Sequence, residues 1–125
     1  MAVRAGEPAG PGPGVIAWPA STDEVAALVR YARRAGVAVV PFGAGSGVCG
    51  GVSPTPDAIV MDLKRLARIR RLDPAAPLVE VEAGHMGVPL ERALNREGFT
   101  LGHFPSSILC STGRPHAAEL ARAER

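Results

Sequence analysis

The chain has 125 residues, of which 46% are hydrophobic, enough for one packed domain but too few for a multidomain enzyme. Its net charge of +2 and its aromatic content of 4% argue against nucleic-acid binding by phosphate neutralisation and base stacking. No apolar run approaches the roughly 20 residues of a membrane span, and no secretory leader is visible, so we expect a cytoplasmic protein.

The N-terminal part predicts two short strands. Residues 1–13 are rich in glycine, proline and alanine, which indicates a disordered lead-in. An apolar strand is expected over residues 15–18, ending before Pro19, which cannot donate to a strand ladder. Residues 37–40 are apolar and mostly β-branched, which is typical of a strand covered on both faces.

A helix is predicted between these two strands. Ser21 and Glu24 have the spacing of a capping box, and Gly36 stands where a left-handed C-cap residue belongs. The strand–helix–strand order is long enough for a parallel crossover, so we expect both strands in one sheet. The apolar positions recur at the spacing of one buried helical stripe, formed by Val25, Leu28, Val29 and Ala32.

Shorter elements are expected after a glycine-rich loop at residues 41–56. One helix is predicted with Pro89 in its first turn and Gly98 at its C-terminal cap. The fold class expected is therefore α+β, with an α/β-type N-terminal subdomain built on a βαβ unit, followed by short strands and one helix. Apolar or alternating runs predict these strands, at residues 58–61, 67–72, 78–83 and 99–104.

The glycine-rich loop is the segment most suited to ligand chemistry. Glycines let successive backbone N–H groups approach an anion, and Ser46 adds a hydroxyl donor, so a phosphate cradle is predicted with a merely flexible loop as the alternative. Residues 45–50 match G-x-G-x-x-G, but the Gly-Gly-Val-Ser-Pro run that follows cannot open the helix of a Rossmann site. A Walker A loop is excluded because no Gly-Lys-Ser/Thr ends the segment.

Four segments, taken in order, resemble one known family. Residues 18–25 (Trp-Pro-Ala-Ser-Thr-Asp-Glu-Val), 39–46 (Val-Val-Pro-Phe-Gly-Ala-Gly-Ser) and 81–84 (Val-Glu-Ala-Gly) resemble the PCMH-type FAD-binding domain of the vanillyl-alcohol oxidase superfamily. Residues 102–112 are similar to the alkyldihydroxyacetonephosphate synthase and FAD-linked oxidase branch. The motifs are specific as an ordered set, and the resemblance covers about residues 15–112.

The resemblance implies an incomplete PCMH-type FAD-binding fold over residues 14–112. It implies that the loop holds the FAD pyrophosphate on backbone amides and that a second segment contacts the flavin. Some relatives attach the flavin through His or Cys; this loop has no His and Cys49 lies late in it, so non-covalent FAD is expected. The residues carried over are Pro41, Phe42, Gly43, Ala44, Gly45, Ser46 and Gly47 in the loop, and Pro105, Ser106, Ser107, Ser111 and Thr112 in the second segment.

The remaining histidines and cysteines predict no separate site. Cys49 and Cys110 are expected to be free thiols, and with the histidines they lack zinc-ligand spacing, so no metal is expected. His85, in a tight turn, favours a solvent-facing position over one near the flavin. His103 lies just before the second segment, and a position lining the site and a position on the surface are both left open for it.

Charged clusters are expected to face solvent. Glu80 and Glu82 lie two residues apart on one strand face, which indicates a solvated pair and not an acid/base pair. The basic residues of positions 64–71 are expected to form a solvated face, with a phosphate-binding tract as the alternative.

Residues 113–125 depart from the family, which continues with a Val-Gly-Gly type turn and a further helix. This tail is rich in Ala and Arg, which leads to the hypothesis of a frameshifted or truncated gene product; a terminal helix is the alternative.

The expected function is the FAD-binding portion of a flavin-dependent oxidoreductase whose small-molecule substrate is bound only by the full-length protein. The alternatives are a non-catalytic nucleotide-phosphate binding module and a non-functional gene fragment. Whether the chain alone is an enzyme, and in what oligomeric state, stays open.

Overall fold

The computed structural model describes residues 12–47, 52–102, 104, 107–112, 117–119 and 121–122. The chain divides into two compact units, unit 1 ending at Arg65 and unit 2 beginning at Leu66. Among the residues described, no helix is long and apolar enough to cross a membrane. Several predictions concern positions outside these ranges, namely the lead-in up to residue 11, Cys49, His103, Pro105 and Ser106.

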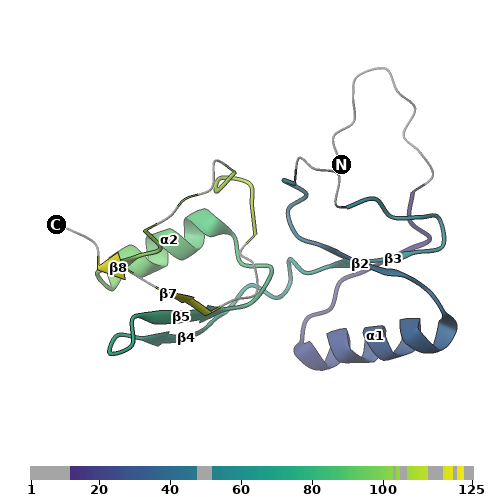
Figure 1. Ribbon diagram of the computed structural model, residues 1–125, viewed down its shortest axis with the longest axis horizontal. Coiled ribbons are helices and arrows are strands. Elements are labelled where there is room, and N and C mark those ends of the chain that lie inside the picture. The colour runs from purple at the N-terminus through teal and green to yellow at the C-terminus, as the bar shows by residue number, and fades with distance from the viewer. Residues whose placement is uncertain are drawn as a thin grey trace, which may run out of the picture. The chain divides into compact units, whose positions relative to one another are not determined.

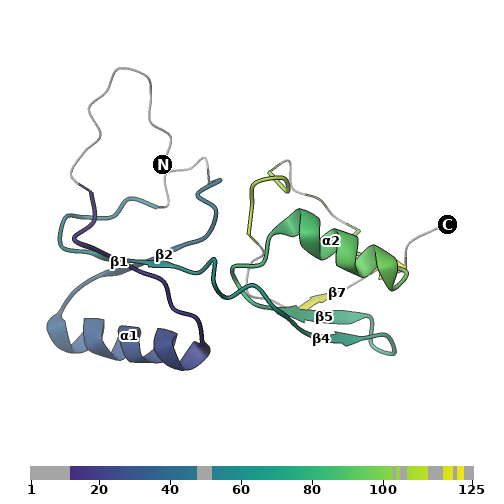
Figure 2. The same cartoon turned by 180° about the vertical axis from the view of Figure 1, so that it is seen from behind.

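Unit 1 is a three-stranded parallel sheet with one helix. Its elements are β1 (Val15–Ala17), α1 (Thr22–Ala35), β2 (Val39–Phe42) and β3 (Ile59–Asp62). The strand order is β1-β3-β2, and β3 pairs in parallel with both neighbours. Figures 1 and 2 show α1 on one side of this sheet and the described part of the connection from β2 to β3 on the other. The predicted strand–helix–strand unit is confirmed, with β3 inserted between its two strands.

The strand covered on both faces is β3, so the prediction of complete burial for residues 37–40 is wrong. All four residues of β3 are buried because a strand flanks it on each side. β2 starts two residues later than expected, and Val39 and Val40 are only half-buried, as suits an outer strand. The apolar composition of residues 37–40 indicates a strand but carries no information on its place in the sheet.

Helix α1 begins and ends as predicted. Ser21 Oγ accepts a hydrogen bond from the Glu24 backbone N–H (3.2 Å), and Glu24 Oε2 accepts one from the Ala20 N–H (2.8 Å). Gly36 ends the helix with φ of 67°, and its N–H donates to the Ala32 carbonyl. These caps depend on residues that are close in the sequence, which explains why the sequence predicts them well.

The buried stripe of α1 is narrower than predicted. Ala32 is buried and Val25 and Leu28 are half-buried, whereas Val29 is exposed. A sheet of three short strands covers only part of the surface of a 14-residue helix.

Unit 2 combines small antiparallel sheets with a second helix. Its hydrophobic core is made by side chains from β5, α2 and β6, namely Val79, Val81, Leu90, Leu94 and Phe99. The strands β4, β5 and β7 form one sheet in that order, β6 pairs with β8, and α2 lies along the first sheet (Figure 1). The bounds are β4 (Ile69–Asp73), β5 (Leu78–Val81), α2 (Gly87–Arg96), β6 (Phe99–Thr100), β7 (Ala117–Glu119) and β8 (Ala121–Arg122).

Local turns set the lengths of these elements. β5 alternates exposed and buried residues as predicted, but it ends at Val81 because the His85 N–H donates to the Glu82 carbonyl (3.0 Å) and closes a turn. The strand expected over residues 99–104 ends after Thr100, since Gly102 takes a φ of 67° that interrupts extended backbone. The C-cap of α2 is Glu97, one residue before the predicted Gly98, and Gly98 then takes a left-handed φ of 79°.

The described part of the tail is extended, not helical. β7 pairs with β5 and β8 pairs with β6, both antiparallel. A terminal helix is therefore wrong for these residues. Strong helix formers give only a weak preference, which pairing with an available strand edge overrides.

Candidate functional site

The glycine loop leaves the carboxyl edge of the sheet of unit 1. All three strands are parallel, so their C-terminal ends meet at this edge, where open parallel sheets bind ligands. The Leu63 N–H donates to the Phe42 carbonyl (2.9 Å) and fixes the start of the loop beside the end of β3. Gly45 has φ of 71°, and no heavy atom lies within 4 Å of the position that a Cβ would take at Gly47. The loop thus exposes glycine backbone at the edge of the sheet where parallel sheets commonly bind ligands.

The backbone donors of this loop fit an anion. Over the described ranges, no hydrogen bond is donated by the N–H groups of Gly43, Ala44, Gly45 or Gly47. Successive N–H groups in a turn conformation form a concavity suited to phosphate oxygens. The donor set and the space at Gly47 therefore fit the pyrophosphate of a dinucleotide.

A buried aspartate joins the strand ends beneath this loop. Asp62 accepts hydrogen bonds from Trp18 Nε1 (3.1 Å) and from the Lys64 N–H (3.1 Å), and its Oδ2 lies 3.0 Å from Lys64 Nζ. Lys64 Nζ also lies 5.2 Å from the centroid of the Phe42 ring, and an Arg65 guanidinium N–H donates to the Trp18 carbonyl (3.0 Å). Sequence reasoning missed this cluster, whose only signal is an acidic residue at the end of an apolar strand.

The second predicted segment belongs to unit 2 and lies against the first turn of α2. The Gly87 N–H donates to the Ser111 carbonyl (3.1 Å), and Met86 forms an isolated antiparallel bridge with Thr112. Ser111 Oγ donates to Ser107 Oγ (2.6 Å). Of the five residues predicted here, Ser111 and Thr112 are therefore held by the backbone at the start of α2, and Ser107 is joined to them through Ser111 Oγ.

Close packing at Gly87 fixes this segment. A Cβ at Gly87 would lie 2.7 Å from Ile108 Cγ1 and 3.2 Å from the Ile108 carbonyl oxygen. His85, just before the helix, is half-buried, and its Nδ1 lies 3.0 Å from the Met86 carbonyl oxygen. Cys110 is a free, exposed thiol in the same segment.

Glu82 corrects the prediction of a solvated acidic pair. Glu80 is exposed, but Glu82 is only 8% exposed, and its buried carboxylate accepts hydrogen bonds from the Arg68 N–H (2.7 Å) and guanidinium (3.0 Å). Arg70 lies 2.5 Å from the same carboxylate. The Arg68 hydrogen bonds hold the pKa of Glu82 below its usual range and raise the pKa of Arg68. Glu82 therefore ties the chain before β4 to the end of β5.

The basic run of residues 64–71 is exposed, as predicted, but anchored by acidic partners. Besides the Glu82 pairs, Lys64 pairs with Asp62 and Arg71 with Asp73. Within the described ranges, no group of three His, Cys, Asp or Glu residues is placed to hold a metal ion.

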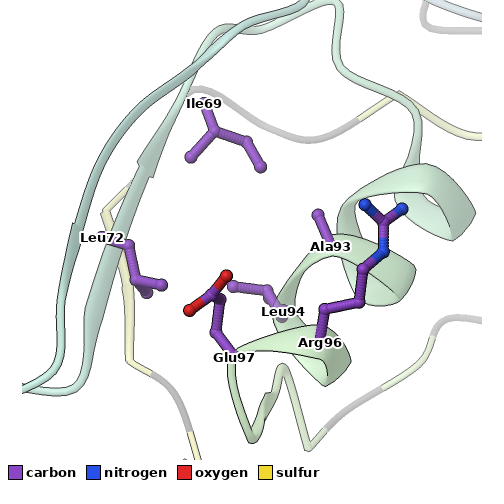
Figure 3. Close-up of a pocket in the computed structure, with 6 residues that line it drawn as sticks. All are labelled: Ile69, Leu72, Ala93, Leu94, Arg96 and Glu97. Atoms are coloured by element: carbon purple, nitrogen blue, oxygen red, sulfur yellow. The ribbon is translucent and has the colours of Figure 1, made fainter.

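Unit 2 also has a hollow of about 260 Å³ between β4 and α2 (Figure 3). Apolar side chains form most of its wall, and the Glu97 carboxylate lies beside Leu72 and Leu94 (Figure 3). None of the predicted site residues lines it, so it stands apart from the candidate site. Its lining residues are Ile69, Leu72, Ala93, Leu94, Arg96 and Glu97.

Residues 13–113 match the family described as FAD binding domain. The chain belongs to this family. The alkyldihydroxyacetonephosphate synthase of Trypanosoma brucei brucei is 33% identical to it over 105 residues, 80% of this chain and 17% of the relative. A solved alkyldihydroxyacetonephosphate synthase structure superposes with a TM-score of 0.72 at 33% identity, covering 78% of this chain and 20% of that one.

The glycolate oxidase subunit GlcD of Bacillus subtilis is 29% identical over 100 residues, 80% of this chain and 21% of the subunit. The chain thus spans about a fifth of the length of these relatives. The predicted family and the predicted α+β class are confirmed, and the chain is an FAD-binding domain of the kind found in FAD-linked oxidoreductases.

Proposed function

We propose that the chain binds FAD non-covalently and holds its pyrophosphate on the backbone amides of residues 41–47. The observation that carries this proposal is that the N–H groups of Gly43, Ala44, Gly45 and Gly47 donate no hydrogen bond within the described ranges, and that they lie at the carboxyl edge of a parallel sheet within the family match. The absence of His and Cys from residues 41–47 supports non-covalent binding. The flavin end is proposed to contact the second segment, including Ser107, Ser111 and Thr112.

The work of this chain in catalysis is binding and orientation. Bound flavin supplies hydride or electron transfer, while the protein fixes its position and electrostatic surroundings. Glycine at position 45 allows the left-handed turn that aligns neighbouring amides, and Gly47 leaves room for an approaching oxygen. The Gly87–Ile108 contact holds the second segment in one position.

We further propose that the chain is the cofactor-binding part of a longer oxidoreductase acting on a small molecule such as a hydroxy acid. Its coverage of about a fifth of the relatives supports this, as does the glycolate oxidase subunit among them. On this proposal the substrate is held by the remainder of the protein, and the isolated chain binds FAD without turning over substrate.

A titration with FAD tests the binding proposal. Purified chain should quench FAD fluorescence, and Gly47→Ala should weaken that binding about tenfold or more, because the added methyl occupies the space proposed for pyrophosphate. Gly12→Ala is the matched control, since its Cβ also meets nothing within 4 Å and it lies outside the loop. Unchanged FAD affinity in Gly47→Ala, or no FAD binding by the wild-type chain, would contradict the proposal.

A further inference from the structure

Lys64 is the single lysine of the chain and stands beside the glycine loop. Its Nζ lies 3.0 Å from Asp62 Oδ2 and 5.2 Å from the centroid of the Phe42 ring, and Phe42 directly precedes Gly43. Two contacts thus hold the ammonium between Asp62 and the ring of the residue that precedes Gly43. The side chain is nevertheless 51% exposed, so the ammonium is accessible from solvent.

The charge of Lys64 is only partly committed to Asp62. An ammonium group has three donors, and its ion pair with the one Asp62 carboxylate cannot engage all of them. The Asp62 carboxylate is buried and is shared with Trp18 Nε1 and the Lys64 backbone N–H. Arg65 places a second cation at the same edge, anchored to the Trp18 carbonyl. Residues 62–65 therefore carry two cations and one buried carboxylate at the edge from which the loop departs.

We propose that Lys64 contacts the pyrophosphate held by the loop and makes the site select FAD over riboflavin, which has no phosphate. This inference rests on the proposed function. Neutral backbone amides fix the position of phosphate oxygens, but a charge-assisted hydrogen bond from an ammonium is roughly twice as strong as a neutral one. Asp62 acts as the positioning residue, because it holds Nζ beside Phe42.

Charge substitutions at position 64 give the first test. Lys64→Gln should weaken FAD binding about tenfold while leaving riboflavin binding unchanged, and it should flatten the decline of FAD affinity with ionic strength. Lys64→Arg keeps the charge and should retain most of the affinity. Arg30→Gln is the matched control: it removes the same charge from an exposed position of α1, on the other side of the sheet from the loop (Figure 1).

A direct signal from the Lys64 amine gives the second test. Reductive methylation with ¹³C-formaldehyde labels the ε-amine of the single lysine and keeps its positive charge, and the α-amine label has a separate resonance. Adding FAD or ADP, which both carry a pyrophosphate, should shift the Lys64 resonance. Adding riboflavin should leave it in place.

The outcomes separate this inference from the proposed function. If the wild-type chain binds no FAD, both proposals fail. If it binds FAD and Gly47→Ala weakens that binding, the loop proposal stands. In that case two results would overturn the role of Lys64 without affecting the loop proposal. They are an unchanged ratio of FAD to riboflavin affinity in Lys64→Gln, and a Lys64 resonance that does not shift when ADP is added.

Discussion

Replacing Gly87 with alanine tests how the second candidate segment is held. The new Cβ would stand 2.7 Å from Ile108 Cγ1, whereas carbon atoms in good contact are about 3.5–4.0 Å apart, so residues around Ile108 must move by roughly 1 Å. The nearest atom, Cγ1, is an inner carbon of the Ile108 side chain, and the Ile108 carbonyl oxygen is also close. Rotation of the outer end of that side chain therefore does not relieve the clash.

The expected cost follows from this displacement. Overpacking of this kind costs about 1–3 kcal/mol, and the higher helix propensity of alanine recovers less than about 1 kcal/mol at the first helical position. A net loss of about 1–2 kcal/mol should lower the unfolding midpoint by roughly 4–8 °C for a chain of 125 residues. Since the same movement displaces the hydrogen bond from Gly87 to Ser111, FAD affinity should fall as well.

Thermal unfolding and FAD titration of four proteins measure the effect. They are the wild type, Gly87→Ala, Ile108→Ala and the double variant. The double variant should be less destabilised than the sum of the single changes, because truncation of Ile108 removes the nearer clash. Strict additivity, or a Gly87→Ala protein as stable as the Gly12→Ala control, would show that the two residues are not packed together.

Two further predictions concern the interior of unit 2. Because the pKa of Glu82 is lowered in the folded chain, the stability that this carboxylate contributes is present above its unfolded pKa of about 4.3 and is lost as the pH falls through the folded value. The difference in unfolding midpoint between wild type and Glu82→Gln should therefore be full at pH 7 and shrink towards acid pH; a constant difference would refute the ion-pair explanation. Leu94→Ala should cost about 2–5 kcal/mol in urea unfolding, since Leu94 is 1% exposed within the core cluster. Ile69→Ala, at a position 38% exposed, is the control and should lower the free energy of unfolding clearly less. Equal losses in the two variants would show that Leu94 does not lie in the core of unit 2.

Features that depend on neighbouring residues could be read from the sequence. The Ser21–Glu24 cap and the left-handed C-cap at Gly36 are set within a few residues, and the structure has both where the pattern predicts; the C-cap of α2 is Glu97, one residue before the predicted Gly98. The order of parallel strands could not be derived in the same way. The insertion of β3 between β1 and β2 depends on the return path of the chain, which a short apolar run does not encode.

The candidate site shows the same division. The glycine loop can be recognised from its composition, because glycine adopts positive φ angles and allows close approach to backbone with little steric cost. The Trp18–Asp62 hydrogen bond joins residues 44 positions apart, and no periodicity connects them. Glu82 was expected in solvent because alternation assigns a face but does not reveal that Arg68 and Arg70 fold over it.

The position of β3 also has a consequence for the order of folding. In the described structure β1 and β2 have no ladder with each other, and each gains its sheet partner only when residues 59–62 arrive. A chain emerging during synthesis therefore carries two unpaired strands and a helix until the glycine loop has been made and has turned back. The segment proposed to cradle the cofactor is therefore also the connection that brings in the one strand with which both β1 and β2 pair.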